Sequence, residues 1–233
     1  MRPSLMLLSL LVAMLAPMRA GAQQAPDSRP GIAVFPFTNG GSFGPDQDDL
    51  AALEVGIQQM LLTELAQNEQ LRIVERSRLR EILQEQALVT SGQVDPGTAA
   101  RIGKLVGARY VITGVFIDLY GRFRIDGRVV DVETGEILNT QQVQDRKQNL
   151  YEMLVELAGS ITRGVDLPAL PARVAEQRRA REIPAEAVTL FSRAQVYQDG
   201  GRQEQAIELY RQIAVRFPQM TEATEALRQI GGG

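Results

Sequence analysis

The chain has 233 residues, with 25 Lys and Arg against 28 Asp and Glu, so its net charge is −3. That balance argues against a dedicated nucleic-acid binder, which needs concentrated positive charge. The sequence contains neither Cys nor His, which excludes disulfides, thiol nucleophiles, His-based triads and thiolate or imidazole metal ligands. Chemistry carried by carboxylates, Lys, Ser or oxygen-ligated metals remains possible. We expect no cofactor.

The first 22 residues have the pattern of a secretory signal peptide. Arg2 supplies a positive start, residues 5–16 are apolar, and Ala20-Gly21-Ala22 is a small-residue cleavage site. The alternative is a membrane anchor, but the apolar run is shorter than the roughly 20 residues that a helical span needs. We therefore expect cleavage after Ala22 and a periplasmic protein, soluble or peripheral to the outer membrane, with no Cys to carry a lipid.

A polar leader, residues 23–31, is expected to be disordered, and chain elements begin after it. Residues 32–37 predict a buried strand that ends near Pro36. A glycine-rich loop follows, and then a helix over 48–67 with an apolar stripe. Residues 71–74 predict a second strand, Ser77 caps a second helix, and a third helix covers 96–105.

The pattern changes from helical to extended at residue 109. Residues 110–119 are apolar on both faces and predict a central strand. Residues 123–129 alternate between apolar and charged side chains, which is typical of a half-exposed strand. A third strand is expected over 137–143, with tight turns at 120–121 and 134–135, and a helix over 150–165.

These elements predict an α/β (α+β) domain over residues 32–166. The expected order is β-α-β-α-α-β-β-β-α, in which the first two strands need crossover helices and the last three form an antiparallel meander. The simplest packing is a mixed sheet of about five strands covered by helices.

Three prolines, Pro168, Pro171 and Pro184, predict a linker over residues 167–184. Its Arg178, Arg179 and Arg181 have two interpretations: contacts with an acidic partner or anionic lipid, or a solvated linker, and the interleaved Glu residues favour the second.

The last predicted part, residues 185–230, resembles one tetratricopeptide repeat. Helices are expected over 185–198, 203–216 and 221–230, and small and aromatic side chains fall near the expected places of a 34-residue period. A plain helical hairpin is the alternative. We take Leu190, Tyr197 and Tyr210 as candidate partner-binding residues.

Four groups of residues carry side chains capable of chemistry, but their spacing favours structural roles. The acidic run at 46–49 has no calcium-loop spacing and suits a helix start, and the glycines at 40–44 lack a phosphate-loop ending. The carboxylate pairs Glu75/Glu81 and Asp126/Asp131 are explained by a strand-to-helix junction and by turn chemistry. We therefore expect no catalytic and no metal-binding residue.

Residues 30–165 resemble the CsgG/HfaB family of curli-secretion proteins, and the amino-terminal domain of TolB is similar in organisation. The resemblance rests on the strand at 32–37, Glu75-Arg76 with Leu79, the Gly103–Gly107 turn into 108–111, and the 131–137 segment. It implies a CsgG-like scaffold and a role in envelope assembly.

The resemblance implies that channel members of the family insert two long transmembrane hairpins into this scaffold. This chain differs from them. Here the connection at 119–123 is a tight turn that leaves no room for the first insert. We expect a non-enzymatic periplasmic scaffold or accessory protein that acts by docking envelope or secretion proteins, with self-association into a homo-oligomer open. The alternatives are an oligomeric curli-type channel component and a regulator of a cell-wall enzyme.

Overall fold

The computed structural model describes residues 27–42, 47–85 and 94–231. The predicted signal peptide and residues 23–26 of the predicted leader lie outside the described residues. So do Asp46 of the acidic run and the last two residues of the glycine-rich loop.

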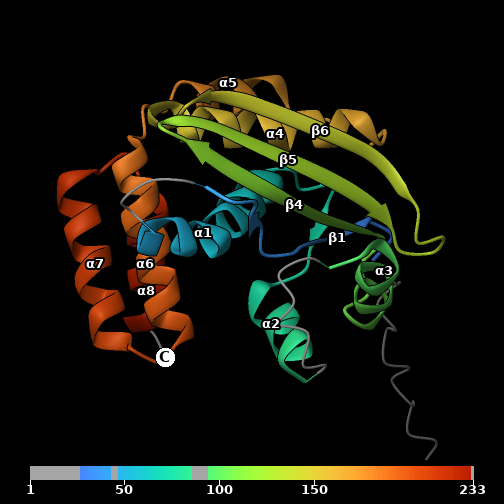
Figure 1. Ribbon diagram of the computed structural model, residues 1–233, viewed down its shortest axis with the longest axis horizontal. Coiled ribbons are helices and arrows are strands. Elements are labelled where there is room, and N and C mark those ends of the chain that lie inside the picture. The colour runs from blue at the N-terminus through green and yellow to red at the C-terminus, as the bar shows by residue number, and fades with distance from the viewer. Residues whose placement is uncertain (1–26, 43–46, 86–93, 232–233) are drawn as a thin grey trace, which may run out of the picture.

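The centre of the fold is one mixed sheet with strand order β3-β1-β4-β5-β6 (Figure 1). β1 is parallel to both of its neighbours, whereas β4, β5 and β6 form an antiparallel meander. The mixed sheet is as predicted, and so is the order of its elements apart from β2. The strands are β1 Gly31–Val34, β2 Thr38–Asn39, β3 Arg72–Ile73, β4 Tyr110–Leu119, β5 Arg122–Asp131 and β6 Ile137–Arg146.

Helices connect the parallel strands and follow the meander. The sequence located each of them within a few residues, except α5, which falls in the predicted linker. They are α1 Gln47–Ala66, α2 Arg76–Glu85, α3 Pro96–Leu105, α4 Leu150–Gly164, α5 Ala172–Arg179, α6 Ala185–Asp199, α7 Gln203–Arg216 and α8 Thr221–Gly231. In the described part of the chain, no helix combines the length and apolar character needed to cross a bilayer.

Alternation along β1 divides the core between the two faces of the sheet. Ile32 and Val34 join the large cluster that α1 and α4 cover. Ala33 and Phe35 point the other way and join a smaller cluster with α2 and α3. Because successive strand residues face opposite sides, four fully apolar residues in a row give a strand buried on both faces.

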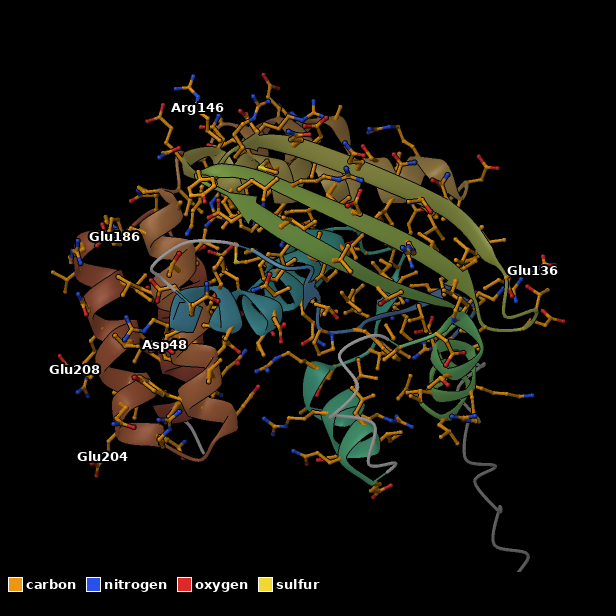
Figure 2. The ribbon with its side chains drawn as sticks, viewed as in Figure 1. Asp48, Glu136, Arg146, Glu186, Glu204 and Glu208 are labelled. Carbon is orange, nitrogen blue, oxygen red and sulfur yellow. The ribbon has the colours of Figure 1, made fainter. Side chains whose placement is uncertain are left out.

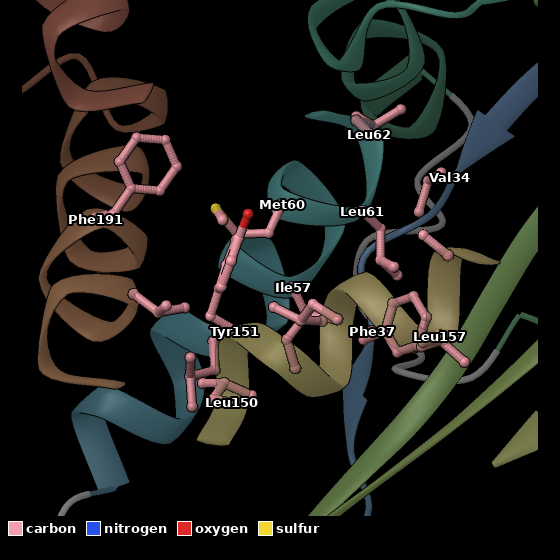
Figure 3. Packing of buried hydrophobic residues seen from close by; sticks show 14 of the residues in the cluster. Val34, Phe37, Ile57, Met60, Leu61, Leu62, Leu150, Tyr151, Leu157 and Phe191 are labelled. Carbon is pink, nitrogen blue, oxygen red and sulfur yellow. The ribbon is translucent and has the colours of Figure 1, made fainter. Parts of the chain in front are cut away.

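The large cluster continues from the sheet through α1 into the C-terminal helices. Figure 3 shows Val34 and Phe37 on one side of α1 and Phe191 of α6 on the other. Ala194 and Tyr210 belong to the same cluster and are fully buried. α1 is therefore covered on opposite sides by the sheet and by the C-terminal helices, residues 185–231, which we call the tail. This explains its many buried residues.

A glycine lets α1 and α6 approach closely. A Cβ placed on Gly56 would overlap the side chain of Ser192 and lie 3.2 Å from its Cα. Ser192 is itself fully buried, and its hydroxyl donates to the carbonyl of Val188 within α6. The two helices can thus cross this closely only because Gly56 has no Cβ.

Two details of the sheet differ from the sequence predictions. β2 lies in the stretch predicted as a loop, and it pairs in parallel with Val115 and Phe116 of β4. β4 is ten residues long and extends beyond the end of β1, so its open edge accepts a two-residue strand with no hydrophobic signal of its own. β6 also runs three residues further than expected, to Arg146.

The β4–β5 connection is the tight turn that the sequence predicted. Leu119 faces Arg122, so only Tyr120 and Gly121 form the loop, and both have positive φ, 54° and 84°. Two such residues fit the primed turn that matches strand twist, which favours Asn-Gly.

We expect Tyr120→Asn to stabilise the protein by about 1 kcal/mol, because Asn tolerates the left-handed region better than an aromatic residue. The Tyr120 side chain is 88% exposed, so its removal sacrifices little packing. Urea denaturation measures the change. Gly121→Ala should shift the midpoint the other way, and equal effects of both variants would contradict the account.

Candidate docking groove

A groove of about 680 Å³ lies where the α/β part meets the C-terminal helices. Its walls come from the second half of α1, from β3, from the start of α2, and from α6 and α8. Side-chain amides and carboxylates make up eight of its seventeen lining residues. Those used below are Ile73, Glu75, Arg76, Gln195, Glu225 and Gln229.

One side of the groove is a sheet edge. The N–H groups of Arg72 and Val74 donate to Pro30 and Ile32, at 3.1 and 2.8 Å, so both face β1. Because strand residues alternate, the N–H and C=O of Ile73 point away from β1. Ile73 lines the groove, and β3 is the last strand on this side of the sheet. The groove therefore presents backbone groups to an extended segment.

Arg76 crosses from α2 to α6 and joins the two parts of the protein. Its Nε donates to Gln59 Oε1 at 3.0 Å and its Nη2 to Gln195 Oε1 at 2.5 Å. Its Nη1 forms an ion pair with Asp199, which Arg80 also contacts. The predicted Glu75-Arg76 junction thus positions Arg76, whose charge is met by Asp199 inside the protein.

The candidate residue Tyr210 lies beneath this network rather than on the surface. Its side chain is fully buried. Its hydroxyl accepts from Gln195 Nε2 at 2.6 Å and donates to Gln198 Oε1 at 2.8 Å. Burial raises the pKa of the phenol, so it stays neutral. In this structure Tyr210 holds two groove-lining amides in place, and direct contact with a partner would need the helices to separate.

The other two candidates, Leu190 and Tyr197, are half-buried against the large cluster. The guanidinium of Arg202 lies over the ring of Tyr197, 4.3 Å from its centre. Within the described residues, neither belongs to the groove lining. Their role in partner binding, like the tetratricopeptide assignment, stays a prediction.

A buried ionic cluster joins α1 and α8 to Arg178 and Arg181, which the sequence predicts to lie in a solvated linker. We define it as Glu64 of α1, Arg178 and Arg181 of the 172–181 segment, and Glu222 of α8. Arg178 Nε donates to Glu64 Oε2 at 2.9 Å, and Arg181 donates to both oxygens of Glu222 at 2.7 and 2.6 Å. The two arginine side chains are only 11% and 14% exposed. The solvated interpretation is therefore wrong for Arg178 and Arg181.

Glu222 and Arg178 keep their charges although they are buried. Burial alone would raise the pKa of Glu222, but the hydrogen bonds and charge of Arg181, with Arg178, outweigh it and lower that pKa. Burial likewise opposes the charge on Arg178, and Glu64 more than compensates, so its pKa is raised. Tyr151, whose ring lies under Arg181, has its own pKa raised by burial and by Glu64.

Two carboxylates of the groove, those of Glu75 and Glu225, can meet the charges of an incoming segment. Both side chains are exposed and line the groove. Glu222 also lines it but is held by Arg178 and Arg181. With the charge of Arg76 met by Asp199, the groove presents net negative charge to an incoming segment.

Asp126 and Asp131, the second carboxylate pair considered for chemistry, have structural partners. Asp131 accepts from the N–H groups of Glu133 and Thr134 at 2.8 and 3.1 Å, which confirms the turn assignment. Asp126 is held by Arg124 at 2.8 Å. Among the residues described, no group of three or more acidic side chains is placed to hold a metal ion.

A family model of the curli production assembly/transport component CsgG matches residues 14–121. This segment belongs to the CsgG family. The described part of the CsgG segment contains β1 to β4 and the helices between them, and the match ends in the β4–β5 turn. The 131–137 segment, on which part of the predicted resemblance rested, falls outside the match. No curated protein matches the sequence.

Several solved structures are similar to the chain at low identity. The LpoB C-terminal domain from Escherichia coli is 20% identical, with 54% of this chain and 88% of that chain covered, at a TM-score of 0.39. TolB from Acinetobacter baumannii is 16% identical, with 60% and 29% covered, at 0.41. The PelC dodecamer from Paraburkholderia phytofirmans is 14% identical, with 61% and 90% covered, at 0.33. The assignment of the fold rests on the strand order described above.

Sequence reasoning missed the groove because its walls come from three separate stretches of the chain. One sequence signal was present. Gln195 and Gln198 are three residues apart, so their amides lie on one face of a helix. The partners of Arg178 and Arg181 gave no signal, since Glu64 and Glu222 are over 40 residues away in the chain.

Proposed function

We propose that this chain is a non-enzymatic accessory protein of the cell envelope, exported to the periplasm, that serves assembly or secretion by docking other proteins. The observation that carries the proposal is the match of residues 14–121 to the curli production assembly/transport component CsgG. The groove between the CsgG segment and the tail supplies a place where such docking would occur.

The proposed mode of docking is strand addition. An extended segment of a partner would hydrogen-bond to the edge of β3 through Ile73, which gives affinity without a defined sequence. Lys or Arg side chains of that segment would meet Glu75 and Glu225 on either side. The amides of Gln195 and Gln229 offer further donors and acceptors.

A specific feature favours this function over a channel component. The resemblance implies that channel members carry a long insert in the β4–β5 connection. In this chain that connection is the two residues Tyr120 and Gly121. The accessory role requires only the scaffold that remains.

In-cell photo-crosslinking tests the proposal. A crosslinking residue at Gln229, which is exposed and lines the groove, is expected to capture envelope or secretion proteins. Arg228 is a matched control, because it is exposed on the same helix but lies outside the groove lining. Glu225→Arg should reduce capture from position 229 severalfold, since it reverses one of the two charges.

Two results would count against the proposal. Equal products from positions 228 and 229 would show that the groove is not the docking surface. Capture that is unaffected by Glu225→Arg would contradict the charge complementarity. A cell-wall synthase among the captured proteins would support the regulator alternative.

A further inference from the structure

The meander of β4, β5 and β6 has one face that the described helices leave largely open. α4 packs against the opposite face, where Phe123, Ile125 and Val143 are buried. On the open face, the smaller cluster with α2 and α3 includes Val111 of β4 and Val130 of β5 and no other residue of these three strands. Within the described part of the chain, the stretch of β5 from 122 to 128 therefore faces solvent on this side.

The register places four arginines on the open face. Residues 123 and 125 are buried on the α4 side, so residues 122, 124, 126 and 128 point the other way. Arg146 of β6 is directly opposite Arg122 and shares its face, and the only register shift lies beyond Val129. The arginines are Arg122, Arg124, Arg128 and Arg146, all exposed.

This face is opposite in charge to the rest of the molecule. Asp126, which Arg124 contacts at 2.8 Å, is the one acid that the three strands place there. Four arginines against one aspartate give a positive face in a chain of net charge −3. The remainder of the chain is therefore acidic, and the face attracts a negatively charged partner.

Apolar side chains lie beside two of the arginines at the β4–β5 turn. Leu119 is opposite Arg122, so Leu119, Arg122 and Arg146 form a row across the end of the sheet. Leu119 is 49% exposed, and Tyr120, the next residue, is 88% exposed. Figure 2 shows Arg146 at the opposite end of the sheet from Glu136. We call Leu119, Tyr120, Arg122 and Arg146 the basic tip.

The basic tip contains two arrangements that the fold does not favour. Tyr120 has a φ of 54°, in a region where an aromatic residue is disfavoured. Arg122 and Arg146 are directly opposite each other, and like charges in that position repel. Asp145 is opposite Phe123 and so lies on the other face. Local costs of this kind are typical of residues that serve binding rather than stability.

We propose that the basic tip binds the surface of a phospholipid bilayer through its anionic headgroups. Arg122 and Arg146 match phosphate oxygens with paired N–H groups. Tyr is favoured at the level of the headgroups, and Leu119 reaches the apolar layer beneath them. The two exposed apolar side chains favour lipid over an acidic protein segment, which would need only the arginines.

This contact goes beyond the proposed docking function and leaves the groove accessible. β3, which lines the groove, and β6, which carries Arg146, are at opposite ends of the sheet order. Because the rest of the chain is acidic, an anionic surface repels it and orients the molecule with the basic tip toward the lipid.

Binding through the basic tip is weak and reversible. An arginine near an anionic surface raises the affinity about fivefold. Two partly exposed apolar side chains bury less than one acyl chain, which alone gives only marginal binding. We therefore expect binding that requires anionic lipid and weakens as salt is added.

Co-sedimentation with vesicles tests the charges. The protein is expected to bind vesicles of phosphatidylglycerol and not those of phosphatidylcholine. Arg122→Gln and Arg146→Gln should each weaken binding about fivefold, without loss of stability, because each removes the repulsion between them. Arg228→Gln, an exposed arginine of α8, is the matched control and should bind as the wild type does. All variants share residues 1–22, so their differences report on the substituted position.

Tyr120→Asn separates binding from folding. This variant is expected to raise the midpoint of urea denaturation while it lowers binding to phosphatidylglycerol vesicles severalfold. Opposite changes of the two quantities cannot arise from partial unfolding. Unchanged vesicle binding by Tyr120→Asn would remove the aromatic contact from the account.

A fluorescent reporter locates the contact. The chain contains no Trp, so Tyr120→Trp introduces a single indole that should shift its emission to shorter wavelength on phosphatidylglycerol vesicles. Val215→Trp, at a position 82% exposed on α7, should show no shift.

Three outcomes would overturn the inference. They are equal behaviour toward the two kinds of vesicle, wild-type binding by both Arg122→Gln and Arg146→Gln, and an emission shift as large at position 215 as at position 120. None of these depends on capture of a partner in the groove, so the proposed function stands or falls separately.

Discussion

Replacing Arg178 with Met is expected to lower the free energy of unfolding by about 3–5 kcal/mol, because it leaves Glu64 buried without its partner. The Glu64 side chain is 3% exposed and that of Arg178 is 11% exposed, so water cannot substitute for the lost bonds. The change should appear as a lower midpoint in urea or thermal denaturation.

Two further variants distinguish charge from packing in the ionic cluster. Glu64→Leu combined with Arg178→Met removes the pair together and should recover part of the loss, since no isolated charge remains near position 64. Arg124→Met breaks the surface pair with Asp126, in which Arg124 is 46% exposed, and should cost under about 1 kcal/mol. A surface variant as damaging as Arg178→Met would contradict the role assigned to burial.

The second large effect is expected at the crossing of α1 and α6. Gly56→Leu should destabilise the protein by about 3 kcal/mol, at the upper end of what overpacking costs, because the backbone of α6 must move away from position 56. Hydrogen exchange is the informative readout. Amides of α6, α7 and α8 should lose protection more than those of β4 and β5, since the change separates the tail from the sheet.

Glycine variants elsewhere and at the contact itself provide the controls. Gly159→Ala in α4 meets only the flexible end of Arg163, at 3.2 Å, and should be neutral or stabilising by up to about 1 kcal/mol. Gly56→Ala should recover stability when Ser192→Gly is added, because the second change removes the overlapping atoms. Uniform loss of protection throughout the chain would contradict a local effect at the crossing.

Elements with a strong local pattern could be predicted from the sequence. The apolar run at 110–119, the alternation at 123–129 and the turn at 120–121 each have a signal within a few residues, and the structure confirms all three. β2 could not be predicted in this way, because Thr38 and Asn39 are extended only through pairing with Val115 and Phe116 of β4.

The site needed contacts between distant residues, which a local pattern does not contain. Arg178 and Arg181 look like surface charge until Glu64 and Glu222 are placed beside them. Tyr210 has the aromatic character expected of a binding residue, and its complete burial follows only from the packing of α7 on α6 and of α6 on α1. The groove likewise exists only once Gln195 and Ile73, from distant parts of the chain, line the same space.

The parallel pairing of β1 with β4 also has a consequence for the order of folding. β4, β5 and β6 are consecutive and joined by short turns, so they can pair as soon as they are made. β1 pairs with β4 in a register that places Ile32 opposite Tyr110, almost 80 residues later in the chain. This pairing cannot form until β4 has been made. α1 waits longer still, because Phe191 and the rest of its cover come near the end of the chain. During synthesis and refolding, α1 is therefore the helix whose apolar sides stay exposed longest, and it is where a folding factor would be needed most.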